Sequence, residues 1–241
     1  MIGSRDNFLD RIEKRNGFLI DQRFDPTRLG PKTADVDGRR YYRFMDYIYI
    51  PKPPQRLSPD EVMAVCDLRI EMFDRVVNKS LNQLVMSSMV DAVRRRFATT
   101  PPDPLMALDF GCGPGFSAAL FREGWGPCEI TGVDLSSKAI EVARRGGLQA
   151  DVVSYGGRLP FEAATFDVVL ASFVLHFHIE SASLAEIRRV LSEEGIFVFN
   201  VYNETPDGLW ESLRRARFAS SCSCLLGTLP GTHRVYSALP C

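Results

Sequence analysis

The sequence lacks an excess of charge of either sign and has no long apolar run. Its 29 Lys and Arg nearly balance 30 Asp and Glu over 241 residues, for a formal net charge of −1. The overall basic balance typical of proteins that bind nucleic acid is therefore missing. The longest apolar run, Phe166 to Ile179, is too short for a membrane span and contains Asp167 and two histidines. We expect a cytoplasmic protein without a membrane or nucleic-acid partner, since the N-terminus also lacks the apolar core of a signal peptide.

Histidine is scarce and cysteine follows no pattern. The three histidines do not cluster, and the six cysteines show none of the paired Cys-x-x-Cys spacing of zinc sites. We therefore expect no metal ion and, in a cytoplasmic protein, six reduced thiols.

The first hundred residues predict an extension that is mostly helical from about residue 58. Residues 1–55 are charged and interrupted by glycine and proline, apart from an aromatic-rich segment, 39–54, that is expected to form either a short strand or a strap packed on the rest of the protein. Ser58-Pro59-Asp60-Glu61 then has the pattern of a helix start, and a second helix is expected from about Leu81 to Phe97. We interpret residues 1–100 as an extension that can cover a substrate site, and residues 101–241 as the main domain.

In the main domain, apolar runs of strand length alternate with helix-like segments. The strand-like runs are Leu105–Phe110, Glu129–Val133, Phe166–Phe173 and Gly195–Val201, with a weaker one at Leu148–Val153. Continuous apolar runs are typical of strands that are buried on both faces of a parallel sheet. The alternation predicts an α/β fold, in which a doubly wound, mostly parallel sheet lies between two helical layers.

The segment LDFGCGPG, Leu108–Gly115, places three glycines between the first strand and a helix. Such glycines let a ligand approach the backbone beyond the strand end, although a tight turn without a ligand also needs them. Asp134 ends the second strand, where a carboxylate can accept both hydroxyls of a ribose. The dinucleotide fingerprint would need glycine at Phe116 and is disfavoured; a phosphate-binding P-loop is excluded because no Gly-Lys-Ser/Thr follows.

Together with LPFEAATFDVVLAS at residues 159–172, these motifs resemble the class I S-adenosylmethionine-dependent methyltransferases, over about Leu105 to Asn203. The resemblance implies a Rossmann-like sheet, S-adenosylmethionine as cofactor and methyl transfer as the reaction. It also implies a set of cofactor-binding roles: Asp109, Gly111 and Gly113 along the methionine, Asp134 at the ribose, Leu135 beside the adenine, and Ser172 at the end of the fourth strand.

Three details of this resemblance stay open. The family's acidic residue before LPF, which meets the adenine amine, is absent here; either Asp151 takes its place or Tyr155 stacks on the purine. His176 follows the fourth strand and is either a general base for the substrate or a packing residue. Asn200, Tyr202 and Asn203, near the end of the fifth strand, contact the substrate or simply begin a loop.

The sequence near the C-terminus gives only weak signals for the last strands of the sheet. After a helix at about Asp207–Phe218, only Leu225-Leu226 and His233–Ala238 are candidates for the last two strands. We therefore expect the C-terminal part to be atypical or incomplete, which would expose the edge of a neighbouring strand.

The function favoured by these observations is in-line methyl transfer to an oxygen or nitrogen of a small-molecule metabolite. A nucleic-acid or protein methyltransferase and a non-catalytic cofactor-binding subunit of a complex are the alternatives. An NAD-dependent oxidoreductase is disfavoured by the glycine spacing. A homodimer stays open.

Overall fold

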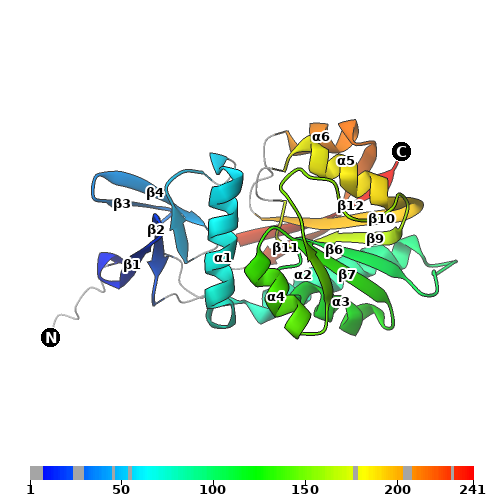
Figure 1. Ribbon diagram of the computed structural model, residues 1–241, viewed down its shortest axis with the longest axis horizontal. Coiled ribbons are helices and arrows are strands. Elements are labelled where there is room, and N and C mark those ends of the chain that lie inside the picture. Colours follow the sequence, from blue (N-terminus) through cyan, green and yellow to red (C-terminus); the bar gives the residue numbers. More distant parts are fainter. Residues whose placement is uncertain are drawn as a thin grey trace.

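The chain forms a small antiparallel sheet and a large mixed sheet, with one helix, α1, standing between them (Figure 1). The structure is a computed structural model that describes residues 8–23, 30–44, 47–53, 56–175, 179–202, 208–228 and 231–241. None of the helices in these ranges has the length and apolar character that crossing a membrane requires.

The N-terminal sheet is the first difference from the predicted fold, because this region was expected to be irregular. After a 3-10 turn, η1 (Phe8–Arg11), its five strands run in the order β1-β2-β5-β4-β3. They are β1 Ile12–Arg15, β2 Phe18–Asp21, β3 Thr33–Val36, β4 Arg39–Phe44 and β5 Ile48–Ile50. The two-residue turns Asn16-Gly17 and Asp37-Gly38 have positive φ throughout, which is the turn that tight hairpins prefer. The extension is therefore a sheet followed by helices, and these Asn-Gly and Asp-Gly pairs were the overlooked signal.

Two long helices follow, α1 (Pro59–Val76) and α2 (Lys79–Arg96). Ser58 accepts a hydrogen bond from the Glu61 amide while the Glu61 side chain accepts one from the Ser58 amide, which is a complete capping box. One apolar face of α1 packs on the small sheet in a cluster that includes Ile48, Ile50, Val65 and Leu68. This contact joins the small sheet and α1 into one unit.

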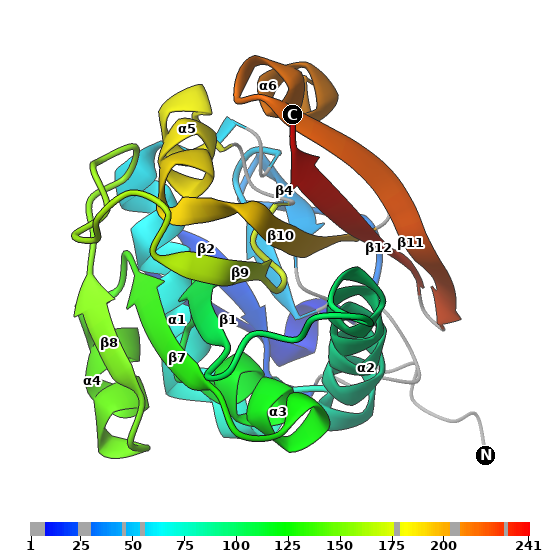
Figure 2. The same ribbon diagram turned by 90° about the vertical axis from the view of Figure 1, so that its right-hand side faces the viewer.

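The large sheet has seven strands in the order β11-β12-β10-β9-β6-β7-β8, and the predicted doubly wound, mostly parallel arrangement is confirmed. The parallel strands are β6 Met106–Phe110, β7 Glu129–Asp134, β8 Gln149–Val152, β9 Phe166–Ala171 and β10 Leu191–Tyr202. Helices α2, α3 (Phe116–Trp125) and α4 (Ser137–Arg145) contribute to the core on one face, and α5 (Ser181–Val190) and α6 (Leu209–Arg215) cover the other (Figure 2). Side chains of β6 alternate between the two cores: Ala107 joins one and Leu108 the other.

The C-terminal hairpin corrects the expectation of an incomplete sheet. β11 (Phe218–Thr228) pairs antiparallel with β12 (Gly231–Pro240), which in turn pairs antiparallel with β10. β11 is hard to find in the sequence because it is the edge strand. Residues 219–222, Ala-Ser-Ser-Cys, are all exposed and therefore carry no apolar alternation.

Candidate functional site

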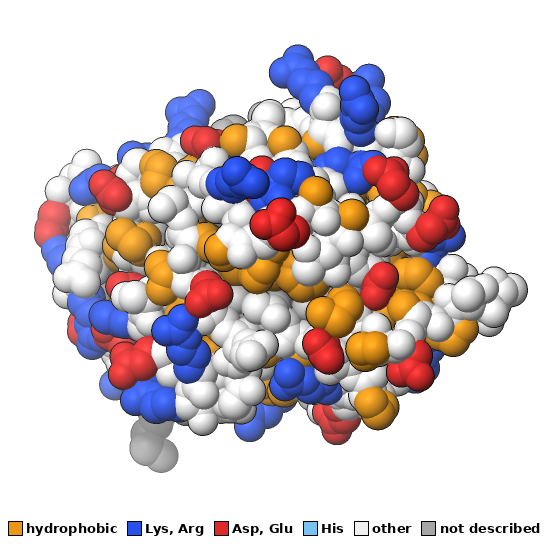
Figure 3. All heavy atoms as spheres, turned by 45° about the vertical axis from the view of Figure 1, so that its right-hand side comes forward, with side chains coloured by type: hydrophobic (Ala, Val, Ile, Leu, Met, Phe, Trp, Pro, Cys, Tyr) orange, Lys and Arg blue, Asp and Glu red, His pale blue; other side chains and the backbone are white. Residues whose placement is uncertain are grey.

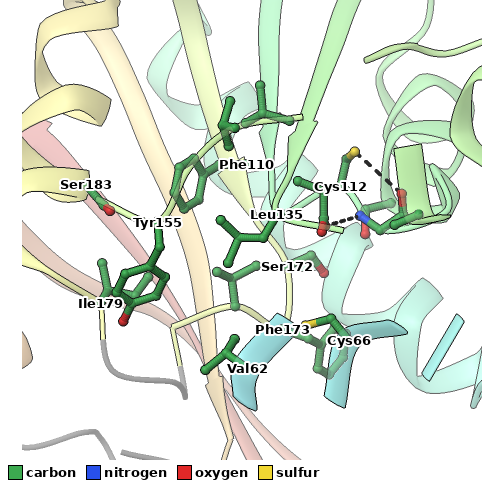
Figure 4. Close-up of a pocket in the computed structure, with 18 of the residues that line it drawn as sticks. Val62, Cys66, Phe110, Cys112, Leu135, Tyr155, Ser172, Phe173, Ile179 and Ser183 are labelled. Carbon is green, nitrogen blue, oxygen red and sulfur yellow. Dashed lines mark hydrogen bonds between the residues drawn. The ribbon is translucent and has the colours of Figure 1, made fainter. Parts of the chain in front are cut away.

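A pocket lies beyond the carboxyl ends of β6, β7 and β9, and α1 forms its outer wall (Figure 4). This is the position where open α/β sheets bind ligands. From the sheet it is lined by the glycine loop, by Asp134 and Leu135, and by Ser172 and Phe173. The small sheet is coupled to this wall, since the apolar cluster beneath α1 also packs against Leu135.

Each glycine of the loop after β6 has its own reason to lack a side chain. Gly111 has φ of 74°, and a Cβ there would lie 2.5 Å from Cγ2 of Val174. Gly113 has φ of 53°, but a Cβ there would meet nothing within 4 Å. Gly111 is thus required by close packing against the segment after β9, whereas Gly113 leaves open space along the pocket.

The backbone amides of this loop are already used within the protein. The amides of Gly111 and Cys112 both donate to the carbonyl of Val133, at 2.8 and 3.0 Å. The Gly113 amide donates to Asp134, and the Gly115 amide donates to the Cys112 carbonyl. A loop that binds pyrophosphate must keep such amides free to point at the anion. This geometry therefore argues against a dinucleotide, in agreement with the glycine spacing.

Asp134 ends β7 with its carboxylate held in place by the backbone. One oxygen accepts from the Gly113 amide and the other from the Ser136 amide, each at 2.9 Å. Burial raises the pKa of Asp134, against the opposing effects of these amides and of Arg69. Each oxygen has a second lone pair, so the carboxylate can still accept from the two hydroxyls of a ribose.

Asp109 lies beneath the loop and is fully buried. Neither of its carboxylate oxygens has a hydrogen-bond partner of normal geometry among the described residues. Burial, and next the Asp134 carboxylate, raise the pKa of Asp109 to about 7, although the amide of Ala118 opposes the shift. A buried, unsatisfied carboxyl is costly unless a cation or donor is brought to it. β6 thus carries a strongly perturbed acid beneath the glycine loop.

The remaining predicted positions divide into residues inside and outside the pocket. Leu135, Tyr155 and Ser172 line it. Asp151 does not: it lies exposed on β8 and pairs with Arg144 at 2.8 Å. Of the two residues considered for the adenine, only Tyr155 is at the pocket.

Of the residues considered for contact with the substrate, Asn200 can be placed in the structure and His176 cannot. His176, the candidate base, lies outside the described residues. Asn200 is fully buried on β10, where its Oδ1 accepts from the amide of Phe173 at 2.7 Å. Asn200 therefore lies behind the pocket wall, and the interpretation that it contacts substrate is wrong.

Of the residues that α1 contributes, Cys66, Arg69 and Ile70 were not singled out in the sequence. Cys66, Arg69, Ile70 and Phe73 all line the pocket. Burial raises the pKa of the Cys66 thiol to about 12, so it stays protonated. Arg69 is the one cation among the described lining residues, and it acts electrostatically on Asp134 without an ion pair to it. The helical pattern of α1 was visible, but which face met the main domain was not.

The geometry defines an α/β protein with a pocket beyond its strand ends and a glycine loop that is not built for a pyrophosphate. No group of three His, Cys, Asp or Glu in the described part of the chain is arranged to hold a metal ion.

Comparison with known proteins shows a similarity to methyltransferases. Residues 108–199 match the family model described as "Methyltransferase domain". A malonyl-[acyl-carrier protein] O-methyltransferase of Herminiimonas arsenicoxydans is 37% identical over 93 residues, which cover 39% of this chain and 35% of that relative. A demethylmenaquinone methyltransferase of Thermotoga maritima is 31% identical over 135 residues, covering 54% of this chain and 59% of that relative. The chain thus spans about a third of one relative's length and less than two thirds of the other's.

A solved structure extends the similarity to most of the fold. A Burkholderia thailandensis 1,6-didemethyltoxoflavin-N1-methyltransferase, with bound substrate and S-adenosylhomocysteine, superposes with a TM-score of 0.56 at 18% identity. The match covers 88% of this chain and all of that one. The match of residues 108–199 and these relatives support a class I methyltransferase family with S-adenosylmethionine as cofactor, and the solved structure shows that the fold is shared.

Proposed function

We propose that this protein transfers the methyl group of S-adenosylmethionine to an oxygen or nitrogen of a small-molecule metabolite. The observation that carries the proposal is one pocket that combines the Asp134 carboxylate, the open face of Gly113 and a wall of side chains from α1. When bound, the cofactor supplies a methyl group already activated on a sulfonium. The protein's task is therefore to hold two reactants in line and to exclude water.

The residues of the pocket fit this cofactor. Asp134 would accept from the ribose hydroxyls, while Leu135 and Tyr155 would flank the adenine. The buried Asp109 carboxyl favours a cationic group above the loop, because its ionised form is otherwise unpaired. Arg69 would bind a carboxylate, either that of the cofactor's methionine or that of an acidic acceptor.

A small acceptor is supported by the character of the pocket. Val62, Ile70 and Phe73 of α1, together with Phe173 and Ile179, give it apolar walls. Small-molecule sites are typically apolar concavities with a few placed polar groups. A nucleic-acid acceptor would require a basic stripe at the pocket, whereas Figure 3 shows Lys and Arg interspersed with Asp and Glu over the face it presents. The names of the two relatives also describe small organic acceptor groups, one of them attached to a carrier protein.

The proposal includes a cytoplasmic location, supported by six cysteines that are free thiols. It is tested in two stages. Calorimetry should show binding of S-adenosylhomocysteine and none of NADH. A metabolite extract should then be incubated with protein and cofactor carrying a trideuterated methyl group, and screened for products that gain that label. Binding without any labelled product would favour the non-catalytic subunit, and absence of binding would refute the proposal.

A further inference from the structure

Phe173, directly after β9, has an unusual backbone conformation for a bulky residue. Its φ is 60°, in the left-handed region that aromatic side chains rarely adopt. Such residues persist only when their surroundings hold them there, and they concentrate at functional sites. Phe173 also lines the pocket (Figure 4).

Two residues of the neighbouring strands hold Phe173. Asn200 of β10 accepts from the Phe173 amide at 2.7 Å, and its Nδ2 lies 3.4 Å from Nδ1 of His233 on β12. The ring of His233 packs edge-on against the ring of Phe173, with centroids 5.4 Å apart. Asn200 and His233 are both buried, with exposures of 0% and 3%. A buried amide side chain is costly without hydrogen bonds, so the contact with Phe173 explains why Asn200 lies within the apolar run 196–201 of β10.

The segment is also wedged from the opposite side. Val174, the next residue, occupies the space that a Cβ of Gly111 would take. The Ser172–Val174 segment therefore lies between the glycine loop and Asn200. Because packed interiors transmit small displacements, releasing Phe173 would also disturb the contact with Gly111.

The order of the strands relates this segment to the cofactor. β8, β7, β6 and β9 are consecutive neighbours in the sheet. If the adenine were held at Tyr155 after β8 and the ribose at Asp134 on β7, the residues left to hold the rest of the cofactor would be those at the ends of β6 and β9. Ser172 and Phe173, at the end of β9, would then lie on the side of its methionine and methyl group.

We propose that Asn200 is a positioning residue, which holds the Ser172–Val174 segment through the Phe173 amide and so shapes the wall beside the transferable methyl group. This rests on the proposed function, since it requires S-adenosylmethionine in the pocket. Asn200 does not touch the ligand; it acts through Phe173. Because burial lowers the pKa of His233 to about 4, its ring is neutral near pH 7 and Nδ1 can accept from the Asn200 amide.

The test uses Asn200→Leu, which keeps the size of the side chain and removes the hydrogen bond, and Asn200→Asp, which keeps the acceptor. Binding of S-adenosylhomocysteine is measured by calorimetry. The ¹³C resonance of the methyl group is recorded for bound S-adenosylmethionine labelled at that carbon. We expect Asn200→Leu to bind within about threefold of the wild type but to shift and broaden the methyl resonance. Asn200→Asp should restore the wild-type resonance. Ser237→Ala, which removes a hydroxyl that bonds to Ser221 and Ser223 within the β11–β12 hairpin, is the matched control and should change neither quantity.

An unchanged methyl resonance in Asn200→Leu overturns the inference. Should that variant not fold, Asn200→Ala replaces it with the same expectation and the same overturning result. Failure of the wild type to bind either ligand refutes the proposed function as well, so the two failures are distinguishable. With an acceptor identified, the leucine variant should lower kcat while leaving KM for S-adenosylmethionine nearly unchanged.

Discussion

The amide of Gly113 donates to a carboxylate oxygen of Asp134 over 2.9 Å, and this bond joins the glycine loop of β6 to the acidic end of β7. Two motifs that lie 21 residues apart thus form one surface. The carboxylate is oriented before any ligand arrives, so little ordering remains to be done on binding.

Removing the Asp134 carboxylate should weaken cofactor binding. Asp134→Ala loses charged hydrogen-bond acceptors at the proposed ribose site, so calorimetry should show about 1–3 kcal/mol weaker binding of S-adenosylhomocysteine. Asp151→Ala is the control, because that carboxylate lies on the neighbouring strand but outside the pocket. Equal effects of the two substitutions would contradict the assignment.

Asp109 should make stability depend on pH. Its pKa is near 7 in the folded protein and near 3.8 when unperturbed, so the folded state retains a proton that the unfolded state releases between these values. The contribution of Asp109 to the free energy of unfolding therefore falls as pH rises from about 4 to 7. Asp109→Asn removes this penalty, and urea unfolding should show the variant more stable than wild type at pH 8, by a few kcal/mol on the order expected for a shift of this size.

The same comparison at pH 4 should show most of that advantage gone, because wild-type Asp109 is then protonated in the folded state. The ion-paired Glu71 and Glu186 have lowered pKa values, so their contribution to stability rises with pH, opposite to that of Asp109. Both proteins contain these residues, so their contribution cancels in the difference in unfolding free energy between variant and wild type. A difference that is constant from pH 4 to 8 would exclude Asp109 as its origin.

Arg69 should favour ligands that carry a carboxylate over ligands that lack one. If it binds the methionine carboxylate, Arg69→Met should weaken S-adenosylhomocysteine about tenfold or more, as for loss of a charged hydrogen bond. It should leave 5′-methylthioadenosine, which lacks the amino-acid part, unaffected. Unchanged affinity for both ligands would instead assign Arg69 to an acidic acceptor.

The contact between Ser136 and Asp67 should couple α1 to the start of α4, directly after Asp134. Ser136 is fully buried, caps α4 by accepting from the Ala139 amide at 3.0 Å, and donates its hydroxyl to Asp67 of α1. A double-mutant cycle of Ser136→Ala and Asp67→Ala, followed by urea unfolding, should give a coupling energy of about 0.5–3 kcal/mol. Additive effects would mean that α1 is held by its apolar face and by the Lys138–Glu71 ion pair instead.

What the sequence determined by itself was local. The apolar runs, the glycines after β6 and Asp134 after β7 are read directly along the chain, because strand burial, turn conformation and strand-end position are set by neighbouring residues. Asn16-Gly17 and Asp37-Gly38 belong to the same kind of signal, since they define hairpins whose strands are adjacent in sequence.

The tertiary structure alone decided what depends on distant partners. β2 pairs with β5 rather than with the next strand, and the exposed edge strand β11 has no apolar pattern of its own. Arg69 reaches the pocket only because α1 crosses it, and Asn200 meets Phe173 only because β9 and β10 are neighbours. Local propensity carries no information on which faces meet across such sequence separations. The positions of the glycine loop and of Asp134 were therefore predictable, whereas the side chains that enclose and support the pocket were decided by packing.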